Sequence, residues 1–355
     1  MQSPQPDRSR RTVLCAGAGA ALAAAATASA YAAAPSAPGE RRPEATAPAK
    51  ATTAGPVVRA LAELERAHGA RLGVYARNTA TGRTVRYRAD ESFPLCSVFK
   101  TLAAAAVLRD LDRRGEFLDL RIRYTAQDVE ESGGAPVTGR EDNLADGMTV
   151  AGLCHAAVAH SDNTAANLLL RELGGPTAVT RFCRSLGDTT TRLDRWEPAL
   201  NSAEPWRTTD ITTPAAIGRT YAKLALGDAL VPRDRRQLTE WLLANTTSTH
   251  RFRAGLPADW ALGDKTGTGR YGTTNDVGIA WTPDRAPVVL AVLSTTSDPE
   301  APKDDALVAE SAELLAAELV RGQAPGSPPD STRTMGVRPD ATGASVGAPA
   351  PPTHG

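Results

Sequence analysis

A serine and a lysine stand three residues apart in this sequence, at the start of an alanine-rich apolar run. They are Ser97 and Lys100, in FPLCSVFKTLAAAAVL. On a helix this spacing places both side chains on one face, and free N–H groups at a helix start can stabilise an oxyanion. A lysine that is buried, or that lies beside other cations, can lose its proton and activate a hydroxyl. The pair therefore fits nucleophilic catalysis, although a serine cap beside an exposed lysine is the simpler interpretation.

Three further stretches carry groups suited to the same chemistry. Ser161 begins a Ser-Asp-Asn sequence between two expected helices, where a helix cap is the alternative explanation. Glu197 lies in RWEPALN, within residues 189–213, a stretch without clean periodicity that we call the long loop. Lys265 begins Lys-Thr-Gly-Thr on an expected strand, where an edge strand with a glycine bulge would explain the pattern. Each signal is weak alone.

Together, in this order and at these spacings, the motifs resemble those of the class A serine β-lactamases, whose set is Ser-x-x-Lys, Ser-Asp-Asn and Lys-Thr-Gly. The resemblance extends over about residues 56–322 and includes LADGMTV, SDNTAANLLL, RWEPALN and DKTGTGRYGTTNDV. It implies hydrolysis of the β-lactam amide of penicillins and cephalosporins, through a serine ester that water then cleaves. Such an enzyme gives antibiotic resistance and uses no cofactor or metal.

The resemblance also implies catalytic roles. Ser97 would open the ring, with the backbone N–H groups of Ser97 and Thr268 holding the oxyanion. Lys100 would exchange protons with Ser97, and Ser161 would pass a proton to the departing ring nitrogen. Glu197 would take the proton of the water that cleaves the ester. Whether Lys100 or Glu197 is the base in acylation stays open.

Further residues would contact the substrate or hold the long loop. Asn163 would bind the substrate's side-chain amide, and Asn201 would help to place the water. An Arg195–Asp210 pair, with bidentate geometry available, would pin the long loop. The group expected to bind the substrate carboxylate consists of Lys265, Thr266, Gly267 and Thr268, joined by Arg251 because TTNDV lacks the arginine that some relatives carry on that strand.

The sequence departs from the family pattern in two further places. Many relatives carry an aromatic gate before Ser-Asp-Asn, but VEESGGAPVTGRED contains no aromatic residue. Cys96 adjoins the nucleophile, and some carbapenem-hydrolysing relatives bond a cysteine there to one just after Lys-Thr-Gly. Here that place is Gly269. We therefore expect Cys96 to be a small buried side chain and not part of that disulfide.

These side chains must be positioned by strands at both ends of the folded region and by helices between them. Since a lone two-stranded hairpin is marginal, the terminal strands are expected to form one antiparallel sheet flanked by helices, in an α/β (α+β) fold. The sheet part would comprise about residues 56–90 and 250–322, and an all-helical insertion about residues 91–249. Strands are expected at 71–76, 84–88, 260–268, 276–281 and 287–295. Helices are expected at 56–67, 97–111, 149–160, 164–173, 177–186, 214–226, 234–243 and 305–320.

Composition argues against several other classes of function. Lys plus Arg equal Asp plus Glu at 40 each, so the charge gives no case for nucleic acid or an anionic membrane surface. The five histidines form no ligand cluster and no cysteine has metal-ligand spacing. We expect a monomer whose partners are small β-lactams. Three cysteines remain after Cys15 leaves with the signal, which means at least one free thiol; they are Cys96, Cys154 and Cys183.

The ends of the chain carry other signals. Arg10-Arg11 precedes an alanine-rich apolar stretch, which predicts a twin-arginine signal peptide over residues 1–34 and a secreted protein. An ordinary secretory signal is the alternative. Residues 35–55 are typical of a linker, and the Pro/Gly-rich residues 323–355 of a disordered tail, which leaves 56–322 as the folded domain. No later apolar run is long enough to span a bilayer.

Other proteins on the same fold are the competing interpretations. A D-Ala-D-Ala peptidase or penicillin-binding protein would share Ser-x-x-Lys and Lys-Thr-Gly but lack the deacylating glutamate, so RWEPALN argues against it. A β-lactam sensor domain stays acylated and is usually tethered to a membrane. An inactive secreted scaffold would not need the full set of polar residues.

Overall fold

The computed structural model describes residues 55–321, all within the second of two compact units of the chain, residues 53–355. The predicted signal peptide, most of the predicted linker and the predicted tail lie outside the described residues. Five strands form the main sheet: β1 (Arg71–Asn78), β2 (Thr84–Tyr87), β7 (Ala261–Thr268), β8 (Thr274–Trp281) and β9 (Pro287–Thr295). Their order is β2-β1-β9-β8-β7 and every neighbouring pair is antiparallel. The prediction of one sheet built from both chain ends is confirmed.

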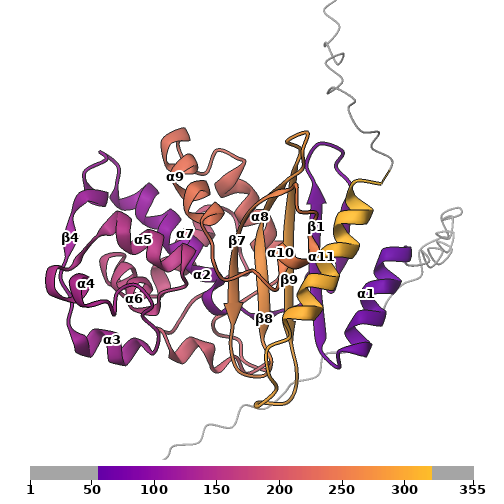
Figure 1. Cartoon of the computed structure of the whole chain (residues 1–355), viewed down its shortest axis with the longest axis horizontal. Helices are drawn as coiled ribbons and strands as arrows, with labels where there is room; N and C mark the ends of the chain where they lie inside the picture. The colour runs from indigo at the N-terminus through magenta and orange to yellow at the C-terminus, as the bar shows by residue number, and fades with distance from the viewer. Residues whose placement is uncertain (1–54, 322–355) are drawn as a thin grey trace, which may run out of the picture. The chain divides into compact units, whose positions relative to one another are not determined.

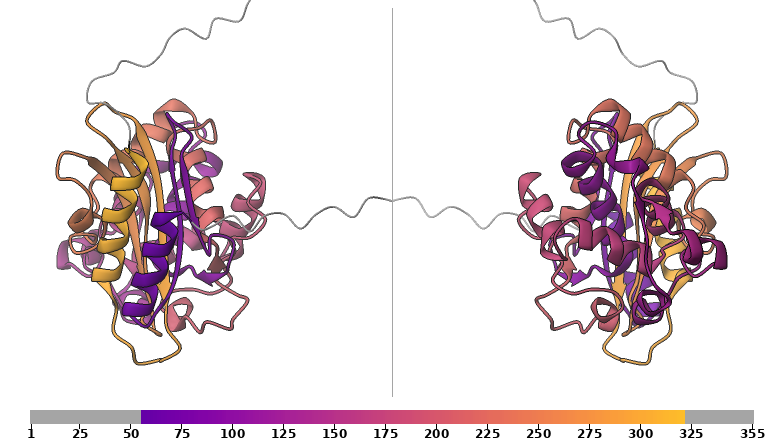
Figure 2. Two further views of the ribbon diagram at one scale, coloured as in Figure 1. Left: turned by 90° about the vertical axis from the view of Figure 1, so that its right-hand side faces the viewer. Right: turned by 90° about the vertical axis from the view of Figure 1, so that its left-hand side faces the viewer.

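Helices cover both faces of this sheet (Figures 1 and 2). On one face lie α1 (Pro56–Ala67) and α11 (Asp305–Leu319), the first and last described helices, with α10 (Phe252–Gly255) beside α11. On the other face, α8 (Pro214–Ala225) packs against β1, β8 and β9, while α9 (Pro232–Leu243) packs against β7. The sheet is thus the middle layer, and each face buries its own apolar cluster.

The insertion between β2 and β7 is helical apart from two short ladders. Its remaining α-helices are α2 (Phe99–Ala106), α3 (Ala126–Ser132), α4 (Glu141–Asp146), α5 (Val150–Ala159), α6 (Asn163–Glu172) and α7 (Thr177–Ser185). The ladders pair β3 (Phe93–Pro94) with β6 (Ile211–Thr212), and β4 (Arg121–Ile122) with β5 (Met148–Thr149). The insertion also contains the 3₁₀ turns η3 (Phe117–Asp119) and η4 (Ala199–Ser202).

The expected helix over residues 97–111 is a continuous path of three geometries. It begins as the 3₁₀ turn η1 (Cys96–Val98), continues as α2 and ends as the π-helical turn η2 (Val107–Leu111). Every residue of α2 is buried, which explains why its sequence is apolar all round and not amphipathic. Helices α5, α6 and α7 all pack against α2. Buried small side chains let these neighbours approach closely, so α2 is a rigid support for the residues at its start.

Three short helices were not predicted: α3, α4 and α10. A signal for α3 was present, because Thr125 and Asp128 form a capping box in which each side chain accepts from the other's backbone N–H. Gly133 then ends α3 in the left-handed conformation, with φ 70°. Helices α4 and α10 have no capping side chain, so the sequence carried little local signal for where they begin.

Candidate active site

Ser97 lies in a turn that two distant segments hold in place. The turn begins at Cys96, whose φ of 46° is in the left-handed region, an uncommon conformation for a residue other than glycine. Asn275 on β8 donates its amide to the carbonyl of Pro94 at 2.9 Å, and Tyr221 on α8 donates its hydroxyl to the carbonyl of Val98 at 3.0 Å. The nucleophile candidate therefore stands on a backbone fixed from the sheet and from a helix.

A buried cluster of charged and polar groups surrounds Ser97. Its hydroxyl donates to Oε1 of Glu197 at 3.2 Å, and the ammonium of Lys100 forms an ion pair with the same oxygen at 3.1 Å. Ser97, Lys100 and Glu197 are 7%, 0% and 3% exposed. Lys100 also donates to the carbonyl of Ser161 at 2.7 Å and to Oδ1 of Asn163 at 2.6 Å, and its ammonium lies 3.4 Å from the Ser161 hydroxyl. Three predicted residues, Glu197, Ser161 and Asn163, therefore contact the Lys100 ammonium, and Ser97 joins them through Glu197.

The carboxylate of Asp162 holds the Ser161 turn in place through several hydrogen bonds. In agreement with the alternative explanation of this turn, Asp162 caps α6, accepting the N–H of Ala165 at 2.8 Å. Its carboxylate also accepts the N–H groups of Val137 and Thr138, at 3.0 and 2.9 Å. Ser161 itself has φ 57°, a strained conformation that persists only where the surroundings determine it. Asp162 is therefore a helix cap, while its neighbours Ser161 and Asn163 are the candidate functional residues.

Asn167 and Asn201 orient Glu197. The amide of Asn167 accepts the Glu197 N–H at 3.0 Å and donates to the Glu197 carbonyl at 2.9 Å. Asn201 donates to Oε2 of Glu197 at 2.5 Å, so both carboxylate oxygens have partners. The peptide bond between Glu197 and Pro198 is cis. Sequence reasoning did not single out Asn167, although it lies four residues after Asn163 and therefore shares its helix face.

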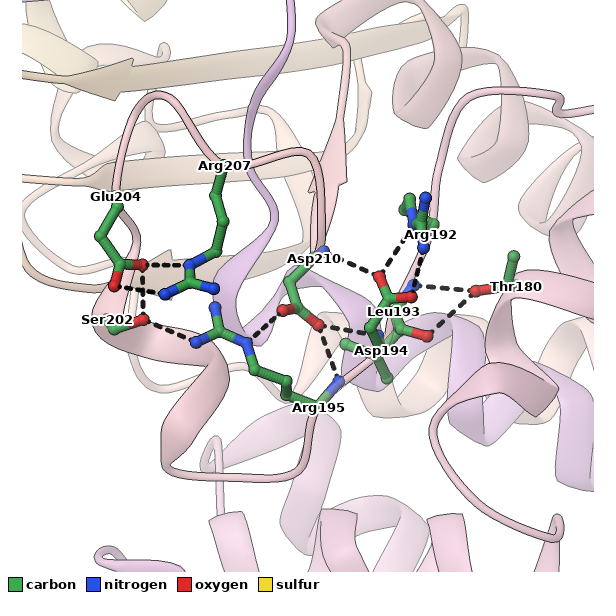
Figure 3. Close-up of polar contacts among 9 residues, drawn as sticks. All are labelled: Thr180, Arg192, Leu193, Asp194, Arg195, Ser202, Glu204, Arg207 and Asp210. Atoms are coloured by element: carbon green, nitrogen blue, oxygen red, sulfur yellow. Dashed lines mark hydrogen bonds and ion pairs between the residues drawn. The ribbon is translucent and has the colours of Figure 1, made fainter. Parts of the chain in front are cut away.

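The predicted Arg195–Asp210 pair closes the neck of the long loop (Figure 3). Nε of Arg195 donates to Oδ2 of Asp210 at 2.6 Å, and Oδ1 accepts the N–H groups of Asp194 and Arg195 at 2.8 and 3.0 Å. The pair uses one guanidinium nitrogen, so it is not bidentate; the second carboxylate oxygen is taken by backbone donors. The carbonyl of Asp210 accepts the N–H of Leu95 at 2.8 Å, which joins this neck directly to the Ser97 turn.

Strand β7 forms the wall opposite the cluster. Lys265 is fully buried and donates to the carbonyl of Thr266 at 2.9 Å. A Cβ on Gly267 would come within 3.1–3.2 Å of Val98 and Cys96, and one on Gly269 within 2.9 Å of the Asn201 carbonyl. Glycine at both positions lets β7 approach the Ser97 turn and the long loop closely.

Arg251 lies behind the exposed end of β7. It is 3% exposed, so it is not an ordinary surface arginine. Its guanidinium donates to the Thr268 hydroxyl at 2.6 Å, to the Gly267 carbonyl at 2.9 Å and to Asp305 at 2.7 Å. The hydroxyl of Thr266 pairs with that of Thr247 at 2.5 Å. The alternation of β7 thus places Thr266 and Thr268 on one face, beside the arginine, and Lys265 on the other.

Burial shapes the electrostatics of both lysines. Desolvation lowers the pKa of Lys100, and the adjacent Glu197 carboxylate opposes that shift. Desolvation, reinforced by the positive charge of Lys100, holds the pKa of Lys265 well below its usual range. Two buried lysines with lowered pKa values thus interact electrostatically beside this cluster, and a lowered pKa lets a lysine give up its proton more readily.

The segment that lacks the aromatic gate lies against this cluster. The carbonyl of Ser132 accepts from the Asn163 amide at 3.0 Å, and the carbonyl of Gly134 accepts the Asn163 N–H at 2.7 Å. A Cβ on Gly133 would lie 3.4 Å from Pro198. Glycines thus stand beside Asn163 and the long loop.

Cys96, Cys154 and Cys183 are free thiols and all are buried, as expected for Cys96. Burial raises the pKa of the Cys96 and Cys154 thiols and raises that of Cys183 to about 12. Between residues 55 and 321, no group of three or more His, Cys, Asp or Glu side chains is arranged to hold a metal ion. Within the same range, no helix has the length and apolar character needed to cross a bilayer.

Comparisons with known proteins match this geometry. Residues 56–319 fit the family model described as "Beta-lactamase enzyme family". A β-lactamase from Streptomyces lavendulae is 70% identical over 263 residues, which cover 74% of this chain and 86% of the relative. The solved β-lactamase from Streptomyces albus G superposes with a TM-score of 0.74 at 68% identity, covering 75% of this chain and all of that structure. A mutant of the "last common ancestor of Gram-negative bacteria" class A β-lactamase has a TM-score of 0.71 at 54% identity, covering 75% of this chain and 99% of that structure.

Proposed function

This chain belongs to the class A serine β-lactamase family and hydrolyses β-lactam antibiotics, a source of resistance, and we propose that it does so through an acyl-enzyme on Ser97. The observation that carries the mechanism is the buried Ser97–Glu197–Lys100 cluster with Asn201 on the second oxygen of Glu197. It supplies a nucleophile, a carboxylate base and a cation within hydrogen-bonding distance of one another.

In acylation, Oγ of Ser97 attacks the β-lactam carbonyl carbon and the ring C–N bond breaks. The backbone N–H groups of Ser97 and Thr268 hold the oxyanion. The Ser97 hydroxyl donates to the Glu197 oxygen that also pairs with Lys100, so its proton passes to this Glu197–Lys100 pair. Ser161 gives its proton to the departing nitrogen and takes one from Lys100, whose ammonium lies 3.4 Å away. The proton from Ser97 then replaces the one that Lys100 gave up, so Glu197 is ionised again before deacylation.

In deacylation, Glu197 takes a proton from a water molecule that attacks the ester carbonyl. The Ser97 oxygen leaves and is reprotonated. Asn201 donates to Glu197 and holds its carboxylate in one orientation. This step distinguishes a hydrolase from a peptidase or sensor on the same fold, because those lack a carboxylate beside the ester.

The substrate carboxylate lies, in this proposal, at the open end of β7. Thr268 is exposed there, Thr266 shares its face, and Arg251 and Lys265 add positive charge. Asn163 contacts the side-chain amide of the substrate. We propose that penicillins and cephalosporins are both accepted, since glycines occupy the place of the aromatic gate.

A chromogenic cephalosporin followed by colour and by intact mass tests the mechanism. We expect many turnovers with no lasting adduct, and neither colour nor adduct with Ser97→Ala. A stoichiometric burst that leaves a stable adduct on Ser97 would instead indicate a sensor or peptidase.

We also propose that the chain is exported through the twin-arginine route and acts as a monomer. Arg10 and Arg11 support the route. Replacing both arginines with lysine should block export, so that the β-lactamase activity stays inside the cells. The control variant Arg8→Lys should leave export unchanged. Equal export of both variants would contradict the route, and a dimer mass in sedimentation would contradict the monomer.

A further inference from the structure

A chain of polar contacts ties the middle of the long loop to its neck (Figure 3). Besides its bond to Asp210, Arg195 donates through Nη1 to the Ser202 hydroxyl at 2.8 Å. That hydroxyl donates in turn to Oε2 of Glu204 at 2.7 Å. The Ser202 hydroxyl thus accepts from a cation and donates to an anion, which determines the direction of both hydrogen bonds.

Arg207 holds the Glu204 carboxylate in position. Its Nε donates to Oε2 at 2.7 Å and its Nη2 donates to Oε1 at 2.8 Å. These bonds keep the pKa of Glu204 well below its usual range, so the carboxylate stays ionised. The Glu204 and Arg207 side chains are 19% and 43% exposed, and such pairs near the surface add little to stability. Their effect is therefore expected in orientation and not in the free energy of unfolding.

Ser202 is the last residue of η4, and Asn201 precedes it. The next residue, Ala203, turns into the left-handed region with φ 50°, so no continuing helix supports Ser202 from that side. On the opposite side the Arg270 N–H donates to the Asn201 carbonyl at 3.0 Å. Within η4 the Asn201 N–H also donates to the Pro198 carbonyl at 3.0 Å. The position of Asn201 against Glu197 thus depends on three supports: this bond, the β7–β8 turn and Ser202.

We propose that Glu204 is a positioning residue for deacylation, which fixes the end of η4 through the Ser202 hydroxyl and so holds Asn201 against Glu197. The inference rests on the proposed function of Glu197 as the deacylating base. Glu204 touches neither the nucleophile nor either catalytic lysine. Asn201 bonds to Oε2 of Glu197, whereas Ser97 and Lys100 both bond to Oε1. The effect of Glu204 should therefore fall on deacylation and leave acylation intact.

Glu204→Ala in the full-length protein tests this with benzylpenicillin. We expect kcat and KM to fall together, by about tenfold, because deacylation slows when the carboxylate is misplaced. Since kcat/KM reports acylation, it should stay within about twofold of the unchanged protein. Glu204→Gln keeps an oxygen acceptor for Ser202 and should retain most of kcat. Ser202→Ala breaks the same link from its other end and should reproduce Glu204→Ala, and Glu313→Gln on α11 is the matched control.

Measurements in a Glu197→Ala background distinguish the positioning role of Glu204 from the role of Glu197 as the deacylating base. If Glu204 acts through Glu197, adding Glu204→Ala to Glu197→Ala changes the deacylation rate by less than about twofold. A full further loss there, a fall in kcat/KM equal to the fall in kcat, or equal losses for Glu204→Gln and Glu204→Ala would each overturn the positioning role. If Glu197→Ala alone fails to accumulate an acyl-enzyme, the proposed function of Glu197 is wrong instead.

Discussion

At the scale of single residues, the proposed mechanism assigns to Glu197 the difference between an enzyme that stays acylated and one that turns over. It is buried, and both of its oxygens are hydrogen-bonded within the cluster. We predict that Glu197→Ala still acylates Ser97 with penicillins but deacylates at least about 100-fold more slowly, the usual contribution of a general base. Intact mass should then show an acyl adduct that persists for many turnover times of the unchanged protein. Loss of acylation with no trapped adduct would contradict the role.

Deprotonation of Lys265 should make kcat/KM fall at basic pH. Burial and the charge of Lys100 lower its pKa, so as pH rises it loses its proton below the ordinary value of 10.5. The charge that we propose to bind the substrate carboxylate is then lost, and KM should rise while kcat changes less. Arginine stays protonated throughout, so Lys265→Arg should move the basic limb of kcat/KM to higher pH. Identical limbs in both proteins would show that another group titrates there.

Sequence reasoning singled out the residues that we propose to react, but not all of those that hold them. The resemblance to the family's motifs implied roles for Ser97, Lys100 and Glu197, and the structure brings the three together. Asn167 could have been found from its helix face. Asn275 and Tyr221 could not, since each contacts the Ser97 turn across more than a hundred positions in the chain, and only the tertiary fold brings such pairs together.

At the scale of elements, strands β7 and β8 carry a buried carboxylate pair behind the wall of the site. Asp264 and Asp276 are both fully buried, and neither Asp264 oxygen nor Oδ1 of Asp276 has a hydrogen-bond partner of good geometry. Desolvation raises the pKa of each, and their mutual repulsion raises that of Asp276 further. Above the unfolded value near 3.8, the native state therefore holds more protons than the unfolded state. The free energy of unfolding should fall as pH rises from there through the raised pKa values.

Asp276→Asn removes one of these charges. We predict that the variant gains stability relative to the unchanged protein as pH rises from about 4 to about 8, because that loss no longer accumulates. Thermal midpoints across this range measure it, with exposed Asp259→Asn as the control. If the thermal midpoints of the unchanged protein and of Asp276→Asn run parallel with pH, the carboxylate pair titrates alike in the folded and unfolded chains.

Element prediction failed where length and pattern were short. The long helices and the five main strands were found within a few residues because their periodicity persists over several turns or alternations. Helices α3, α4 and α10 span seven, six and four residues, and their formation depends on tertiary packing more than on propensity. The π-helical end of the α2 segment had no sequence signal that we recognised.

At the scale of the whole molecule, the described fold closes only when both of its ends are in place. Strand β1 pairs with β9 along its full length, while α1 and α11 cover the same face of the sheet. The site lies toward the other face, yet β7 and β8, which support it, share that sheet. Packing between α11 and the sheet should therefore control how much enzyme is folded, without altering the chemistry of the folded molecule.

Leu315→Ala tests this separation. Leu315 is fully buried in the apolar cluster formed by α1, α11 and the sheet, so truncation removes contacts and leaves a cavity that costs about 2–5 kcal/mol. Exposed Glu313→Ala, two residues earlier on α11, should change stability by less than about 0.5 kcal/mol. Denaturant unfolding measures both, and turnover well below the unfolding midpoint should be unchanged per folded molecule. A fall in kcat without a fall in stability would contradict this separation. It would mean that the contacts of α11 with the sheet influence the geometry of β7 in the folded molecule.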